Sequence, residues 1–130
     1  MIVEPEHEAT VPESYEIDQM RELVVSRAWD TFDDRDLRQH YDRLRADGRF
    51  DPAYRQLIDV RDVETFSLTT AVMLGTALAH VFRSGTPRAI VVANDLQFGL
   101  ARIFAAYSEA DGQIVQVFRE PSAAKEWLGL

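Results

Sequence analysis

Three hydroxyl side chains, Ser67, Thr69 and Thr70, lie where a polar segment that contains Asp62 runs into a strongly apolar one. This change of composition is typical of a loop that leads into a helix, whose first backbone N–H groups have no partner within the helix. Hydroxyl oxygens there cap the helix, and the same N–H groups favour an anion such as phosphate. The sequence therefore supports two roles: helix caps, or a binding site in which Ser67 or Thr69 is a phosphoacceptor.

A second polar pair, Asn94-Asp95, follows the apolar run 89–93 and precedes another amphipathic segment. This pattern predicts a helix cap, and also a rim of the same site, because the carboxyl ends of adjacent parallel strands meet at one edge of a sheet. The candidate residues for contact with a partner or ligand are Asp62, Ser67, Thr69, Thr70, Asn94 and Asp95.

The acidic residues and histidines elsewhere in the chain do not have the spacing of known catalytic or metal-binding motifs. Asp59 and Asp62 could form an acid–base pair, but we favour a capping carboxylate and an Asp–Arg ion pair. His40, four residues after Asp36, is interpreted as part of a surface helix pair, and His80 as a partly buried helix residue or an interface contact. The sequence contains no glycine-rich phosphate loop, no nucleophile elbow and no cysteine. We therefore predict a non-enzyme without catalytic residues, metal or cofactor.

Charge and hydropathy exclude several classes of partner. The formal net charge is −8, and residues 1–13 contribute four glutamates without a basic residue. Phosphate-backbone binding needs a basic face, so we expect no nucleic-acid partner. The arginines are scattered along the chain and are expected on the solvated surface. No apolar run approaches the ~18 residues of a membrane span, so we predict a protein without a membrane span. The N-terminus lacks the features of a signal peptide, and we therefore expect a cytoplasmic location.

Apolar periodicity predicts the elements that position the candidate residues. Residues 1–13 are interpreted as a flexible acidic tail that is dispensable for folding, and 14–130 as the domain. The expected strands are 14–18, 23–29, 56–60, 89–93 and 113–118. The expected helices are one that begins at Thr31 or Asp33 and ends near 47, then 68–83, 96–107 and 121–128. In the third helix, the residues expected to face the core are Leu96, Leu100, Ile103, Phe104 and Tyr107.

The order ββαβαβαβα predicts an α/β single-domain sandwich. Helices between strands imply right-handed crossovers, so we expect a mixed, mostly parallel five-stranded sheet flanked by about four helices. Strand 14–18 is expected at an edge, antiparallel to its neighbour, and the apolar strand 89–93 inside the sheet. The helix 68–83 is apolar nearly all round, and Phe98 lies outside the main stripe of the next helix, so we also expect a homodimer.

This order, together with LIDVRDVETFSLTTAVML, IVVANDLQFGLARIF and VQVFREPSAAKEWLG, resembles the SpoIIAA-like, STAS-like family of small bacterial proteins. The family is related in fold to anti-sigma-factor antagonists and to lipid-binding CRAL-TRIO domains, and the resemblance covers residues 14–130. In the antagonists a Ser-Ser-Gly loop opens the corresponding helix, and a partner kinase phosphorylates one serine. Here Ser67 or Thr69 lies near that position, but Ser-Ser-Gly itself is missing.

The resemblance implies a non-catalytic regulatory domain that binds a protein partner. Its kinship with CRAL-TRIO domains implies an alternative, a carrier for a lipid or another small apolar ligand. A cavity for a lipid competes with core packing in a domain of this size, so we favour the regulator.

Overall fold

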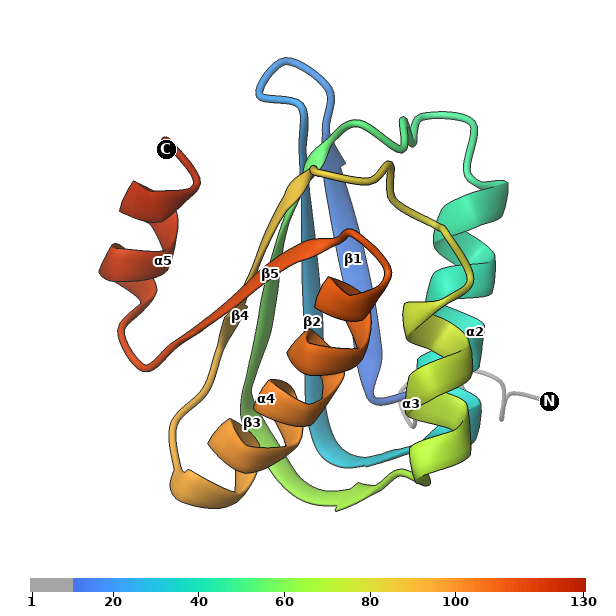
Figure 1. The fold of residues 1–130 in the computed structure, drawn as a ribbon, viewed down its shortest axis with the longest axis vertical. Coiled ribbons are helices and arrows are strands. Elements are labelled where there is room, and N and C mark those ends of the chain that lie inside the picture. Colours follow the sequence, from blue (N-terminus) through green and yellow to red (C-terminus); the bar gives the residue numbers. More distant parts are fainter. Residues whose placement is uncertain (1–10) are drawn as a thin grey trace, which may run out of the picture.

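The computed structural model describes residues 11–130, and its elements follow the predicted order ββαβαβαβα (Figure 1). The strands are β1 (Glu13–Asp18), β2 (Leu23–Asp33), β3 (Arg55–Ser67), β4 (Pro87–Val91) and β5 (Ile114–Phe118). The helices are α2 (Asp34–Ala46), α3 (Thr70–Ala77), α4 (Asp95–Ala110) and α5 (Pro121–Trp127). None of the helices in residues 11–130 is long and apolar enough to span a membrane.

The five strands form one mixed sheet in the order β1-β2-β3-β4-β5. β1 is antiparallel to β2, and the other neighbouring pairs are parallel. Helices α2, α3 and α4 cover one face of the sheet, and α5 covers part of the other (Figure 1). The predicted α/β sandwich is confirmed, with the hairpin strand at an edge and the apolar strand β4 inside the sheet.

Local sequence explains how several elements begin. Asp33 caps α2 in a capping box, because its side chain accepts a hydrogen bond from the Asp36 N–H while Asp36 accepts one from the Asp33 N–H. Pro121 occupies the first turn of α5, where a missing N–H costs nothing. β4 is buried on both faces: Ile90 packs in the larger core, and Val91 in the smaller core under α5.

The segment Arg61–Thr65, expected as a loop, is instead the second half of the long strand β3. β3 pairs with β4 only over 56–59, and its extension pairs with β2 as a two-stranded ribbon. Two register shifts interrupt that ribbon, so the inward-facing positions recur every third residue: Val60 and Val63 are buried and Phe66 is half-buried. This spacing is neither strand nor helix periodicity, which is why the sequence pattern did not predict a strand.

Helix α3 is half as long as expected, because it ends after Ala77 instead of near 83. The chain turns at His80, which has a positive φ of 56°, and then buries Val81 and Phe82 in the core. Val81 and Phe82 are as apolar as the helix, which is why the sequence pattern extended to them, but their backbone is not helical. His80 is therefore not a helix residue; its exposed ring lies 3.2 Å from Asp111 Oδ2.

The core face of α4 also differs from the prediction. Leu96 and Ile103 are exposed, whereas two polar side chains face inward. The buried residues of α4 are Gln97, Ala101, Phe104, Ala105 and Ser108. Ser108 and Gln97 can be buried because their side chains hydrogen-bond to backbone groups, which an apolar stripe does not reveal.

The proposed boundary of the acidic tail is wrong at its end. Glu13 is the first residue of β1 and is buried, and Pro12 is buried beside it, with its carbonyl accepting a hydrogen bond from the Trp29 N–H. The domain therefore includes both residues. The rest of the tail prediction falls on residues 1–10, outside the described residues.

Candidate functional site

The carboxyl ends of β2, β3 and β4 lie at the same end of the sheet, and α2, α3 and α4 begin there (Figure 1). Ser67 is the last residue of β3, Thr69 caps α3, and Thr70 is the first residue of α3. Asn94 caps α4 through its side-chain oxygen, which accepts from the Gln97 N–H. Asp62, expected in a loop at the helix start, lies within the β3 extension and is exposed there, opposite Trp29 of β2.

The carboxylate of Asp34, in α2, accepts hydrogen bonds from the capping residue of α3. The Thr69 hydroxyl donates to Asp34 Oδ2 at 2.9 Å, and the Thr69 N–H donates to Asp34 Oδ1 at 2.8 Å. The Thr69 oxygen also accepts from the Val72 N–H. A phosphate on Thr69 would lose the bond to Asp34 and add negative charge beside its carboxylate. Ser67 is exposed and pairs in the sheet with Asp33.

The Asp33–Asp36 capping box adds further negative charge at this end. The hydrogen bond from the Asp36 backbone lowers the pKa of the Asp33 carboxyl. Burial raises the pKa of the Asp36 carboxyl, although its hydrogen bond from the Asp33 backbone acts in the opposite direction. Asp33, the sheet partner of Ser67, thus stays ionised to lower pH than Asp36.

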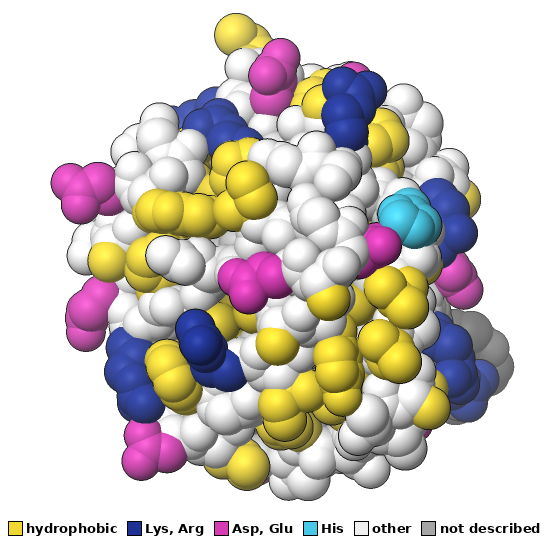
Figure 2. All heavy atoms as spheres, viewed as in Figure 1, with side chains coloured by type: hydrophobic (Ala, Val, Ile, Leu, Met, Phe, Trp, Pro, Cys, Tyr) yellow, Lys and Arg dark blue, Asp and Glu magenta, His cyan; other side chains and the backbone are white. Residues whose placement is uncertain are grey.

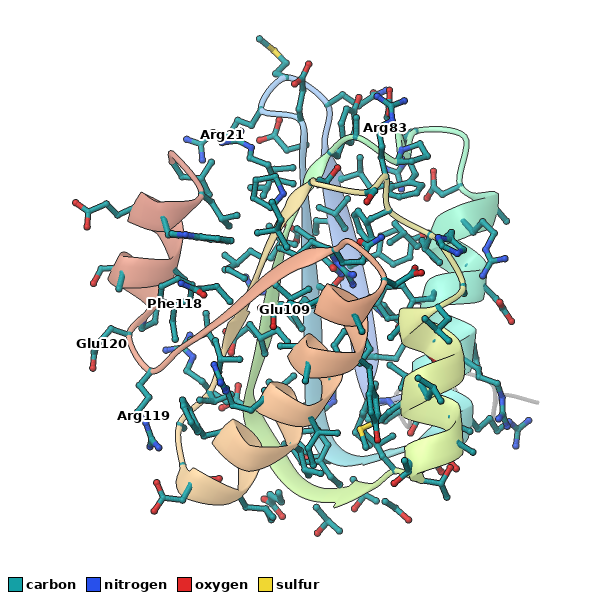
Figure 3. The ribbon with its side chains drawn as sticks, viewed as in Figure 1. Arg21, Arg83, Glu109, Phe118, Arg119 and Glu120 are labelled. Carbon is teal, nitrogen blue, oxygen red and sulfur yellow. The ribbon has the colours of Figure 1, made fainter. Side chains whose placement is uncertain are left out.

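Asp95 at the start of α4 is held by a different contact. Its carboxylate lies 2.8 Å from the guanidinium of Arg119, which sits in the connection between β5 and α5 (Figure 3). Arg119 also lies over the ring of Phe98, at 4.6 Å from its centroid. Among the described residues, the side-chain hydrogen bonds tie Thr69 to α2 and Asp95 to the β5–α5 connection, and none joins these two groups directly.

Replacement of Asp34 with alanine is expected to lower the free energy of unfolding by about 1 kcal/mol, because α3 loses the group that bonds its cap. Urea denaturation followed by circular dichroism measures the change. Asp42→Ala on the exposed side of the same helix is the matched control and should change stability by less than about 0.5 kcal/mol. Equal losses in the two variants would contradict the capping role of Asp34.

An apolar cavity of about 80 Å³ lies between the sheet and the three helices that cover it. The polar side chains in its lining are Gln97 and Tyr41. Phe66, Leu68 and Leu100 also line it and are half-buried. The remaining lining residues are Phe32, Leu37, Ile58, Val60, Met73, Ile90, Ala101 and Phe104. The sequence did not predict this cavity, because its lining comes from six elements and the segment before α3.

Large apolar side chains are exposed on the outer side of the same helices. Leu74 and Leu78, four residues apart at α3, are 39% and 42% exposed, and Leu96 and Ile103, seven residues apart on α4, are 63% and 42% exposed. We call these four residues the α3–α4 face. Figure 2 shows hydrophobic side chains gathered over α3 and the adjoining part of α4. α3 carries no charged residue, so this surface is both apolar and uncharged over the helix.

Sequence reasoning missed a buried polar cluster under α2. The interpretation of His40 as a surface residue is wrong: His40 Nδ1 lies 2.6 Å from Glu13 Oε1, and His40 Nε2 lies 2.8 Å from Ser26 Oγ. All three residues are at most 4% exposed. Arg43, on the same helix, donates to Glu13 Oε1 at 2.7 Å. The order Glu–His–Ser is that of a hydrolase triad, but a serine buried under a helix offers no access to a substrate. The cluster is structural.

The same hydrogen-bonded chain continues to Arg88, which was expected on the surface. Gln56 donates to Ser26 Oγ at 2.9 Å and accepts from Arg88 Nε at 2.9 Å. Arg88 also donates to Tyr41 Oη and lies over the ring of Phe82, at 4.5 Å. Arg88 is only 4% exposed, so its charge is stabilised by hydrogen bonds and aromatic faces instead of water. Because these partners are far apart in sequence and individually ordinary, only the positions of the strands could have revealed them.

Asp59 forms an ion pair with Arg61, as the sequence analysis favoured over an acid–base role. Burial raises the pKa of the Asp59 carboxyl, but hydrogen bonds from the side chain and backbone of Arg61 outweigh burial and lower it. Among residues 11–130, no group of three or more His, Cys, Asp or Glu side chains could hold a metal ion.

No protein-family model matches the chain, and no curated protein matches it. Among solved structures, the chain is similar to an uncharacterized protein from the DUF3478 family of Shewanella loihica PV-4, which has a SpoIIAA-like fold. The two share 20% sequence identity with a TM-score of 0.62, over 90% of this chain and 94% of that chain. At this identity the likeness concerns the fold, and it agrees with the resemblance found in the sequence. The chain has a SpoIIAA-like, STAS-like fold.

Proposed function

We propose that this protein is a non-catalytic regulatory domain that acts by binding another protein through the α3–α4 face. The observation that carries the proposal is the exposure of four large apolar side chains on two adjacent helices, one of which has no charged residue. Exposed apolar surface costs free energy in water, and contiguous patches of it mark interaction sites. The complementary partner presents an apolar surface, such as the apolar stripe of a helix.

The candidate polar residues fit the margin of this surface. Protein interfaces have an apolar centre and a polar rim. Ser67, Thr69 and Thr70 lie at the start of α3, and Asn94 and Asp95 at the start of α4, next to Leu96. Asp62 lies on the β3 extension that leads to α3. We propose that these residues contribute specificity, and that the leucines and Ile103 contribute most of the binding free energy.

The same face is our proposed site of self-association. A symmetric dimer brings one patch against its own copy, and an uncharged helix can do this without juxtaposing like charges. The formal net charge of −8 would oppose most other pairings of two copies.

The alternative function, a lipid carrier, has less support because the cavity is small. The cavity of about 80 Å³ is about half of the ~150 Å³ that holds one benzene molecule in an engineered protein. A lipid chain does not fit in that volume without displacement of α3 or α4.

Affinity capture from the native cell tests the proposal. The variant Leu74→Glu/Ile103→Glu should lose at least tenfold of its specifically bound partner, because both changes place a charge in the centre of the apolar face. Sedimentation equilibrium on the same variant should show loss of the dimer. A Ser67→Ala/Thr69→Ala variant should weaken partner binding by a smaller factor, because the rim contributes less.

The matched control is Met20→Glu/Leu130→Glu, which makes the same change of charge at exposed apolar residues outside α3 and α4. It should retain both the partner and the dimer. Equal retention by the two double variants would remove the α3–α4 face from consideration, and turnover of a metabolite by the purified protein would contradict the non-catalytic assignment.

A further inference from the structure

We infer that the apolar cavity is a binding site for a small, uncharged hydrocarbon group that is smaller than a benzene ring. The inference concerns the interior of the isolated protein and does not depend on the proposed protein partner.

The cavity is built by residues from both layers of the domain. Ile58 and Ile90 of the sheet lie on one side, and Ala101 and Phe104 of α4 lie on another. Phe66 at the end of β3, Leu68 in the segment before α3 and Met73 of α3 complete this part of the lining. Phe66, Leu68 and Leu100 remain half-buried, so we place the route of entry at these side chains. A ligand could therefore enter without unfolding of the sheet.

Both polar side chains of the lining already make hydrogen bonds. Gln97 Oε1 accepts from the Ala93 N–H, and its Nε2 donates to the carbonyls of Arg61 and Val63. The Tyr41 hydroxyl receives hydrogen bonds from Gln56 and Arg88. A water molecule needs two to four polar partners to occupy a buried site, so this cavity favours an apolar occupant over water.

The volume sets the class of ligand. About 80 Å³ is far more than the space of one methyl group, yet about half of the ~150 Å³ of an engineered apolar cavity that binds benzene or xenon. Because the lining is almost entirely apolar and carries no charged side chain, affinity comes from burial of apolar area and from dispersion contacts. The fit therefore excludes long acyl chains and charged ligands.

Xenon is the most direct probe, because it is small, uncharged and apolar. Under xenon pressure, ¹H–¹⁵N spectra of the purified protein should show saturable shifts confined to residues that line the cavity, such as Ile90, Ala101 and Phe104. Propane should give the same set of shifts and raise the thermal midpoint, as expected for a ligand that binds the folded state. Dodecanoate should shift none of these resonances.

Ala101→Leu fills the cavity and should reduce the xenon shifts at least tenfold at equal pressure. Ala106→Leu, at an exposed position of the same helix, is the matched control and should retain them. If Ala101→Leu does not fold, Leu100→Phe replaces it, because it narrows the entry from a half-buried position. Absence of shifts in the wild type, equal shifts in the filled and control variants, or binding of dodecanoate at the same residues would each overturn the inference.

Discussion

Replacement of Glu13 with alanine is expected to lower the free energy of unfolding by about 3 kcal/mol, one of the two largest effects that we predict for a single substitution. The Glu13 side chain is fully buried and accepts from both His40 and Arg43. Removal of one partner from a buried ionic cluster typically costs about 3–5 kcal/mol, because the remaining groups stay buried without compensation. We take the lower end of that range because Arg43 is partly exposed and can turn to water.

The control for this prediction lies on the same strand. Glu16 is exposed on β1, so Glu16→Ala should change stability by less than about 0.5 kcal/mol. Urea denaturation of Glu13→Ala, His40→Ala and the double variant should also give a non-additive cycle, because the two residues share one hydrogen bond. Additive losses, or equal effects of Glu13→Ala and Glu16→Ala, would show that the buried cluster does not stabilise the fold.

The second large effect is expected for Gln97→Met, which keeps the length of the side chain and removes its hydrogen bonds. Gln97 satisfies the Ala93 N–H at 2.6 Å and the Val63 carbonyl at 2.9 Å, and it also reaches the Arg61 carbonyl at 3.2 Å. Each buried backbone group left without a partner costs about 1–3 kcal/mol, so we expect a loss of about 3 kcal/mol.

Hydrogen exchange distinguishes this role from simple packing. Gln97→Met should increase amide exchange in the β3 extension, 61–67, more than in strand β4, because the carbonyls of the extension lose their side-chain partner. Gln39→Met on the exposed side of α2 should leave both exchange and stability unchanged. Uniform acceleration throughout the sheet in Gln97→Met would contradict a specific link between α4 and the β3 extension.

The topology was predictable because it depends on local patterns. Alternation in β1, the continuous apolar run of β4 and the Asp33 and Asn94 caps are each visible in short windows of sequence. The alternation of helices with strands then leaves few arrangements of the sheet. Element ends were less predictable: the β3 extension depends on bulges, and the end of α3 on the backbone at His80.

The candidate site was predictable only in part. The cap roles of Thr69 and Asn94 follow from residue type, and the structure places both at helix starts. The engagement of Thr69 by Asp34 joins residues 35 positions apart, and that of His40 by Glu13 joins residues 27 positions apart. Such contacts need the register of strands and helices, which propensity and periodicity do not supply. The exposed α3–α4 face likewise appears only after the tertiary structure has buried the other side of each helix.

Site-specific photo-crosslinking in the native cell tests the central claim most directly, because it reports contact without a prior choice of partner. A photoreactive phenylalanine derivative at Leu74 should form a discrete covalent adduct with the partner protein or a second copy, and the same derivative at Met20 should form none. Met20 is 95% exposed and Leu74 39%, so burial would not account for a lack of adducts at position 20. Adducts from position 20 and none from position 74 would contradict the assignment of the α3–α4 face as the binding surface.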